Sequence, residues 1–153
     1  MKITTKIAVD IRPDAAFEHF IYKLHAWWPK QYTWSGDKLV EIRINPQVNG
    51  LCTEIGPFGF RCDWGRVTEF KQSVKLSFTW QISPTRIPEP DPDKASLVSV
   101  LFTESSYEST DITLIHSNFE NHGDGASGYA EAMDSEQGWP KILNAFKAYC
   151  QNQ

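Results

Sequence analysis

A chain of 153 residues is the usual size of one domain, and we expect a single domain over 1–153 that buries about 70% of the surface of its unfolded form. Its formal net charge of −4, without a run of Lys or Arg, excludes the positive field that gathers nucleic-acid phosphates. No signal-peptide core follows Met1 and no stretch approaches the roughly 20 apolar residues of a membrane span, so we expect a cytoplasmic protein with neither nucleic acid nor membrane as a partner.

The first predicted elements are a strand and an amphipathic helix. Apolar and polar residues alternate over 3–10, a period of two that is typical of a half-buried strand. Pro13 then opens a segment whose apolar residues recur at i, i+3, i+4 and i+7, which predicts a helix ending near His25. Trp27-Trp28-Pro29 ends that helix, because proline cannot continue the hydrogen-bond ladder.

A series of strands follows the helix. The pattern predicts four of them, separated by short turns, at 39–45, 51–55, 60–70 and 74–82. Segment 84–94 is polar and rich in proline, so it is predicted to be a surface loop. Two further strands are predicted at 96–104 and 111–116. The short connections favour an antiparallel meander of about six or seven strands.

The tail from Gly125 to Gln151 has a helical composition and an apolar stripe at helical spacing. Gly138-Trp139-Pro140 interrupts it, which leaves two arrangements open: a kink, or a stronger helix that starts near this point with Ser135 as a cap. The order of one strand, one helix, six strands and a helix excludes a parallel α/β fold. We therefore expect an α+β fold whose helices cover the concave face of the sheet.

Six short segments carry a resemblance to one family. They are Trp27-Trp28-Pro29, Val48-Asn49-Gly50 with Glu54, Trp64-Gly65-Arg66-Val67, Leu76 to Trp80, Leu114 to Phe119, and Gly138 to Leu143. In these segments and their order the sequence resembles the homologues of the heat-shock-protein ATPase activator, within the START and birch-pollen-allergen superfamily (SRPBCC). The resemblance implies a helix-grip fold: a curved antiparallel sheet around a long C-terminal helix, with a cavity that holds a small hydrophobic molecule. Asn49-Gly50 departs from the double glycine common in such proteins.

The alternation of side chains along strands predicts three inward-facing residues. On the strand 74–82, Phe78 and Trp80 share the face that is predicted to meet the cavity. Each of them either lines the cavity or fills the core, and the N–H of Trp80 requires a partner in both cases. His116 points inward by the same rule, where it contacts a ligand or is satisfied by backbone or water.

The resemblance implies that Glu54 also faces the cavity, where a carboxylate is costly unless it is paired. It either binds a polar group of the ligand or forms a rim salt bridge with an arginine from the set Arg43, Arg61 and Arg66. Four tryptophans are candidates for the mouth of the cavity: Trp28, Trp34, Trp64 and Trp139. The predicted ligand-binding set is Trp28, Glu54, Trp64, Phe78, Trp80, His116 and Trp139.

The sequence lacks the common motifs of hydrolases, metalloproteases and nucleotide-binding proteins: GxSxG, HExxH, the P-loop and GxGxxG do not occur. The three cysteines have no CxxC spacing, so we expect reduced thiols and leave open a disulfide between Cys52 and Cys62. We therefore predict no catalytic residues, no metal and no cofactor, in a monomer or homodimer that binds a small hydrophobic molecule. The alternatives are a module that binds another protein, as a co-chaperone does, and an enzyme with His116 and Glu54 as acid and base.

Overall fold

In the computed structural model, which describes residues 1–153, seven strands form one curved sheet in the order β1-β7-β6-β5-β4-β3-β2. The strands are β1 (Lys2–Val9), β2 (Glu41–Ile44), β3 (Leu51–Ile55), β4 (Arg61–Lys71), β5 (Lys75–Trp80), β6 (Ser96–Ser106) and β7 (Ser109–Ser117). Every neighbouring pair is antiparallel. The predicted meander and the α+β class are confirmed.

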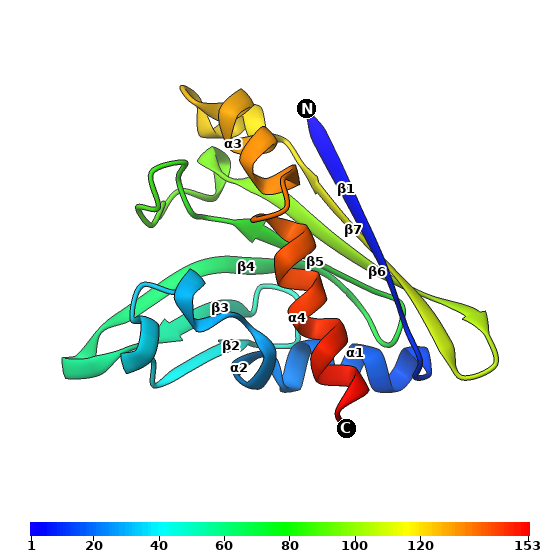
Figure 1. Cartoon of the computed structure of the whole chain (residues 1–153). Coiled ribbons are helices and arrows are strands. Elements are labelled where there is room, and N and C mark those ends of the chain that lie inside the picture. The colour runs from blue at the N-terminus through cyan, green and yellow to red at the C-terminus, as the bar shows by residue number, and fades with distance from the viewer.

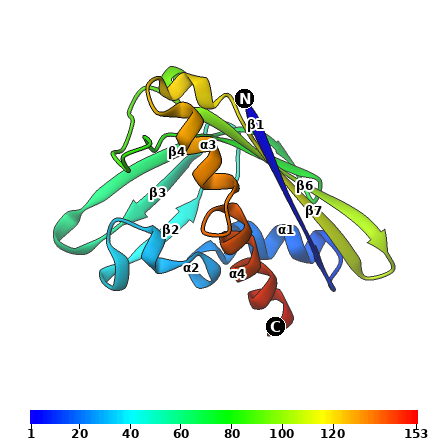
Figure 2. The same cartoon turned by 45° about the horizontal axis from the view of Figure 1, so that its top comes forward.

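Four α-helices cover the concave side of this sheet. They are α1 (Pro13–Tyr22), α2 (Leu24–Trp27), α3 (Ala126–Asp134) and α4 (Trp139–Gln151). Figures 1 and 2 show α4 crossing the inner side of the sheet, with α1 and α2 beside it. This arrangement is the helix-grip fold that the resemblance implied. None of these helices combines the length and the apolar character that crossing a bilayer requires.

The C-terminal tail consists of two helices. α3 ends at Asp134 and α4 begins at Trp139, so the second of the two predicted arrangements is the correct one. Ser135, however, does not cap α4: its hydroxyl donates to the carbonyl of Ala132 at 2.6 Å and ends α3. Gly138 makes the turn possible, because a Cβ there would lie only 2.2 Å from the carbonyl oxygen of Met133.

The side chains of β5 show how strand parity builds the core. Leu76, Phe78 and Trp80 are buried, as their shared face predicted. Val74 was predicted to belong to the same strand, but it lies in the preceding turn, where its N–H donates to Lys71 O, and its side chain is exposed. The predicted strand 74–82 is therefore shorter at both ends.

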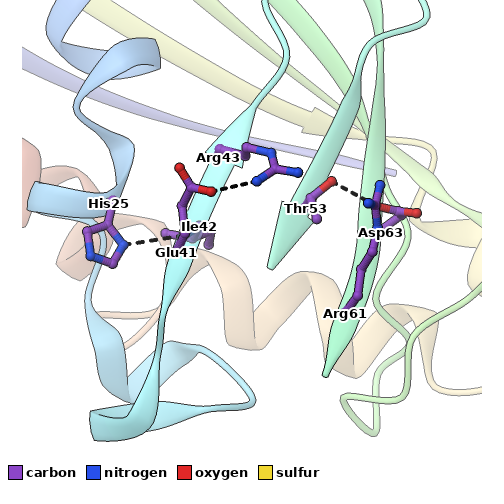
Figure 3. Close-up of polar contacts among 7 residues, drawn as sticks. All are labelled: His25, Glu41, Ile42, Arg43, Thr53, Arg61 and Asp63. Carbon is purple, nitrogen blue, oxygen red and sulfur yellow. Dashed lines mark hydrogen bonds and ion pairs between the residues drawn. The ribbon is translucent and has the colours of Figure 1, made fainter. Parts of the chain in front are cut away.

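The edge strand β2 is held by a side chain from α2. The backbone N–H of Ile42 donates to Nδ1 of His25 at 3.3 Å, a contact visible in Figure 3. This bond occupies one of the backbone donors that an edge strand otherwise leaves free.

The cysteines Cys52 and Cys62 are both free thiols. In the β3–β4 register, Cys52 lies opposite Gly65 and Cys62 lies opposite Glu54, so the two cysteines do not face each other. The disulfide that the sequence left open is absent.

Candidate ligand-binding site

Indole rings fill the space between the sheet and α4. Five of the six tryptophans are buried: Trp27, Trp28, Trp64, Trp80 and Trp139. Trp28 lies at the centre, with its ring centroid 6.2 Å from that of Trp64, 6.4 Å from that of Trp80 and 6.2 Å from that of Trp139. These rings come from α2, β4, β5 and α4, so the cluster joins the helices to the sheet. Each buried aromatic ring contributes roughly 1.5–3 kcal/mol through removal from water.

Where the cavity was predicted, between the sheet and α4, the structure has only small voids. One void of about 10 Å³, here called the inner void, is lined by Trp28, Tyr32, Trp34, Ile42, Glu54, Trp64, Trp80 and Ile82. A second, of about 20 Å³, lies between Trp28, Trp80 and the start of α4. Voids of this size hold about one water molecule.

A larger hollow opens to the surface directly beside the inner void. This outer hollow has a volume of about 190 Å³ and is lined by Gln31, Tyr32, Thr33, Trp34, Ile82 and Arg86. Tyr32, Trp34 and Ile82 border both spaces, so these side chains separate the outer hollow from the inner void. Two of the three belong to residues 29–38, a segment with two short 3-10 turns that we call the lid.

Hydrogen bonds from both sides fasten the lid. The hydroxyl of Tyr32 donates to the carbonyl of Gln137 at 2.7 Å, and the indole of Trp34 donates to the carbonyl of Arg86 at 2.7 Å. The cationic groups of Arg86 and Lys141 also lie 5.6 and 5.4 Å from the centroid of the Tyr32 ring, within the range of cation–π attraction. The lid is thereby tied to the β5–β6 loop and to the α3–α4 connection.

Glu54 fastens the lid from inside the protein. Its side chain, from β3, is only 1% exposed. The carboxylate accepts hydrogen bonds from Trp34 N at 3.2 Å, from Ser35 N at 2.8 Å and from Ser35 Oγ at 2.7 Å. These three donors compensate for the loss of water around the buried charge.

The rim salt bridge considered for Glu54 is therefore wrong. The three candidate arginines have other partners: Arg43 pairs with Glu41, Arg61 pairs with Asp63, and Arg66 donates to Asn49 O. Figure 3 shows that the first two pairs lie on β2 and β4, where Asp63 also accepts a hydrogen bond from Thr53. Glu54 alternates with Thr53 along β3, so its side chain points to the opposite face of the sheet.

A larger groove, of about 550 Å³, lies between β4 and the β5–β6 loop. Its walls include four charged residues: Arg61, Asp63, Arg66 and Glu89. Because Arg61 is paired with Asp63, this groove offers no concentrated charge of one sign. Phe60 is its single aromatic lining residue, whereas Tyr32 and Trp34 line the outer hollow and further indoles line the inner void, so the lid region is the better candidate despite its smaller volume.

His116 points inward as predicted, but side chains satisfy both of its ring nitrogens. Trp139 Nε1–H donates to His116 Nδ1 at 2.9 Å, and Ser96 Oγ lies 2.6 Å from His116 Nε2. Ser96 Oγ also lies 2.7 Å from Nε2 of His122. His116 and Trp139 border neither the inner void nor the outer hollow, and Phe78 does not either. Burial lowers the pKa of His116 to about 3, so the ring is neutral at pH 7.

The structure thus brings four of the seven predicted residues to one space: Trp28, Glu54, Trp64 and Trp80 all line the inner void. Tyr32 and Arg86 line the outer hollow and were not predicted from the sequence. The only available signal was the position of Tyr32 three residues after Pro29, where a helix has just ended. Arg86 lies within a proline-rich loop whose pattern carries no periodicity.

Comparison with known proteins agrees with this architecture. The family model described as Activator of Hsp90 ATPase homolog 1-like protein matches residues 56–151. A solved structure described as an anthrahydroquino-gamma-pyrone synthase, Txn09, in complex with a ligand, is 27% identical, with a TM-score of 0.67 over 97% of this chain and 96% of that one. No curated protein sequence matches the chain.

Two further solved structures share the fold at lower identity. The self-sacrificing resistance protein CalC from Micromonospora echinospora is 20% identical, with a TM-score of 0.69 over 99% of this chain and 94% of that one. A protein of Nitrosomonas europaea is 14% identical, with a TM-score of 0.70 over 99% of this chain and 95% of that one. At these identities the likeness shows the fold alone.

Proposed function

The chain belongs to the family of activator of Hsp90 ATPase homolog 1-like proteins, and we propose that it binds a small, largely apolar aromatic molecule between its sheet and α4, beneath the lid. One observation carries the proposal. The side chains of Tyr32, Trp34 and Ile82 border both the outer hollow of about 190 Å³ and the inner void at the indole cluster. Movement of the lid would join the two spaces into one aromatic pocket.

The fastening of the lid is compatible with opening by a ligand. Apart from backbone bonds and the cation–π contacts of Tyr32, it depends on the hydrogen bonds of Tyr32, Trp34 and Glu54, each worth about 0.5–1.5 kcal/mol net, or up to about 3 where the partner is charged. A ligand that binds the open form more tightly by a few kcal/mol therefore shifts the population. Burial of one flat aromatic skeleton supplies free energy of this order.

The solved structure at 27% identity supports an aromatic ligand. Its name refers to a fused, oxygen-bearing aromatic ring system, and it covers nearly all of both chains. The same name favours a second candidate function, catalysis on the bound molecule. In that case Glu54 would supply the carboxyl group beside the ligand, because it borders the inner void, whereas His116 lies outside it and has both nitrogens occupied.

Binding is tested with xanthene, a flat tricyclic ether of this chemical class, by isothermal titration calorimetry. Gln31 is exposed and borders the outer hollow, so Gln31→Trp fills this space without disturbing the core. We expect this variant to bind xanthene at least tenfold more weakly than the wild type. Tyr107→Trp, in the exposed β6–β7 turn, is the matched control and retains full affinity.

Two results would overturn the proposal. Absence of binding by xanthene and by its oxidised analogue xanthone would show that the lid does not admit a fused aromatic molecule. Equal affinity in the wild type and in Gln31→Trp would place the ligand elsewhere on the protein. Native mass spectrometry of freshly purified protein adds an independent readout, because a bound molecule appears as a discrete mass increase that denaturation removes.

A further inference from the structure

Two of the six indole N–H groups have no hydrogen-bond partner in the protein: Nε1 of Trp28 and Nε1 of Trp64. The two residues are only 7% and 2% exposed, so bulk solvent does not reach these N–H groups. A buried polar group without a partner costs about 1–3 kcal/mol, and native proteins satisfy nearly all such groups. A pair of them in one place is therefore a feature that packing alone does not explain.

The other four indoles show that this fold readily supplies acceptors. Trp27 donates to Phe20 O at 3.1 Å, Trp34 to Arg86 O at 2.7 Å, Trp80 to the Tyr129 hydroxyl at 2.6 Å, and Trp139 to His116 at 2.9 Å. Phenylalanine would fill the positions of Trp28 and Trp64 with a flat apolar ring and would leave no donor to satisfy. The free donors thus distinguish these two positions from the rest of the cluster.

Both indoles border the inner void, although they come from different parts of the chain. Trp28 follows α2 and Trp64 lies in β4, and their rings are stacked at an interplanar angle of 28°. Glu54 borders the same void, but its carboxylate accepts hydrogen bonds from lid residues and none from either indole. The same void is therefore bordered by two indoles whose N–H groups have no acceptor and by one carboxyl group that already has three donors.

We propose that Trp28 and Trp64 recognise a carbonyl oxygen on the ligand, which makes the preferred ligand a neutral fused aromatic ketone. This inference rests on the proposed function and specifies its substrate class. One carbonyl oxygen has two lone pairs and so matches two N–H donors. A carboxylate or phosphate is disfavoured, because the inner void has no cationic side chain in its lining to pair with a buried anion.

Xanthone and xanthene form a matched pair of probes, since xanthone carries a carbonyl where xanthene has a methylene group and the tricyclic skeleton is otherwise the same. Calorimetric titration of the wild type should give an affinity for xanthone about tenfold or more above that for xanthene. Hydrophobicity alone would favour xanthene, so this order of affinities reports hydrogen bonding to the carbonyl.

Conservative variants assign the preference to the two donors. Trp28→Phe and Trp64→Phe remove the N–H and keep an aromatic ring, so in each variant the ratio of the xanthone affinity to the xanthene affinity should fall to near one. Trp27→Phe is the matched control: Trp27 is buried in the same cluster, but its N–H is already bonded to Phe20 O. It should retain the preference.

A second measurement needs no variant and holds even where a substitution impairs folding. Protein labelled with ¹⁵N-tryptophan gives one indole N–H resonance for each of the six tryptophans. Xanthone should move the proton resonances of Trp28 and Trp64 downfield, as hydrogen bonding does, and xanthene should leave them without that shift.

The outcomes separate the two proposals. Equal binding of xanthone and xanthene by the wild type overturns the carbonyl recognition and leaves the aromatic pocket intact. A preference that survives in both Phe variants, or resonances of Trp28 and Trp64 that respond alike to the two probes, overturns it as well. Failure of both probes to bind overturns the proposed function and this inference together.

Discussion

Trp139 Nε1–H donates to His116 Nδ1 at 2.9 Å, and this bond fixes the tautomer of a fully buried histidine. Because Nδ1 accepts, Nε2 carries the proton and donates to Ser96 Oγ. The Ser96 hydroxyl then donates to Nε2 of His122, which also accepts from the Ser96 backbone N–H at 3.3 Å. A directional chain of hydrogen bonds thus joins α4 to β7, β6 and the segment before α3.

This chain makes the stability of the fold sensitive to acid. Burial, with a smaller contribution from His122, lowers the pKa of His116 to about 3 from an ordinary value of 6.5, and burial also lowers the pKa of His122 against the opposing effect of Glu89. Below pH 6.5 the unfolded chain therefore binds more protons than the folded protein, and stability falls as the pH falls. Between pH 6.5 and pH 4 we expect a loss of roughly 2–4 kcal/mol from His116, measured by urea denaturation.

The contribution of His116 is isolated by His116→Gln, which keeps a polar side chain but has no group that titrates in this range. The variant should be less stable at pH 7, and its stability should depend less on pH between 6.5 and 4. The carboxylates Glu69 and Glu120 titrate alike in both proteins, so they cancel in the comparison. An unchanged slope would show that His116 is not the acid-sensitive group.

Ser96→Ala tests the centre of the same chain. Loss of the hydroxyl leaves the Nε2–H of His116 without an acceptor and removes a donor from His122, so we expect destabilisation of about 2–3 kcal/mol at pH 7 in chemical denaturation. Ser99→Ala, on the same strand, removes a hydroxyl that pairs only with Ser77 and should cost less than about 1.5 kcal/mol. Similar losses in both variants would argue against a special role for Ser96.

Much of the fold could be predicted from the sequence, because the apolar residues recur with the periods of strands and helices. Alternation located β1 and the inward face of β5, and helical spacing located α1 and α4. The resemblance in segments such as Trp27-Trp28-Pro29 then placed these elements in a helix-grip arrangement. Four of the predicted site residues meet at the inner void for the same reason, since parity determines which side chains point inward.

The features that periodicity does not encode could not be predicted. The lid has no regular pattern, and its contacts to Arg86 and Gln137 span 52 and 105 residues along the chain. The partners of Glu54 are two backbone N–H groups and a hydroxyl, which any sequence could supply once the lid is placed. His116 was considered as a ligand contact because parity points it inward, but its pairing with Ser96 and Trp139 is set by tertiary packing and could not be predicted.

Glu54→Gln should loosen the lid without unfolding the protein. The amide keeps the size of the carboxylate but weakens its hydrogen bonds to Trp34 N, Ser35 N and Ser35 Oγ. We expect the backbone amides of Trp34 and Ser35 to exchange with deuterium about tenfold faster or more, while amides in β6 change little. Asp37→Asn, on an exposed part of the lid, is the control; equal acceleration in both variants would contradict the role of Glu54 as a fastening.

A pair of glycine substitutions tests the break between α3 and α4, on which the position of Trp139 depends. At Gly138 a Cβ would lie 2.2 Å from Met133 O, so Gly138→Ala forces the turn apart and should destabilise the protein by about 2 kcal/mol or more in thermal or chemical denaturation. Gly128 lies inside α3 with open space around its Cβ position, so Gly128→Ala should instead stabilise the protein by about 0.5–1 kcal/mol through helix propensity. Effects of the same sign at both positions would show that the close approach at Gly138 is not what shapes this turn.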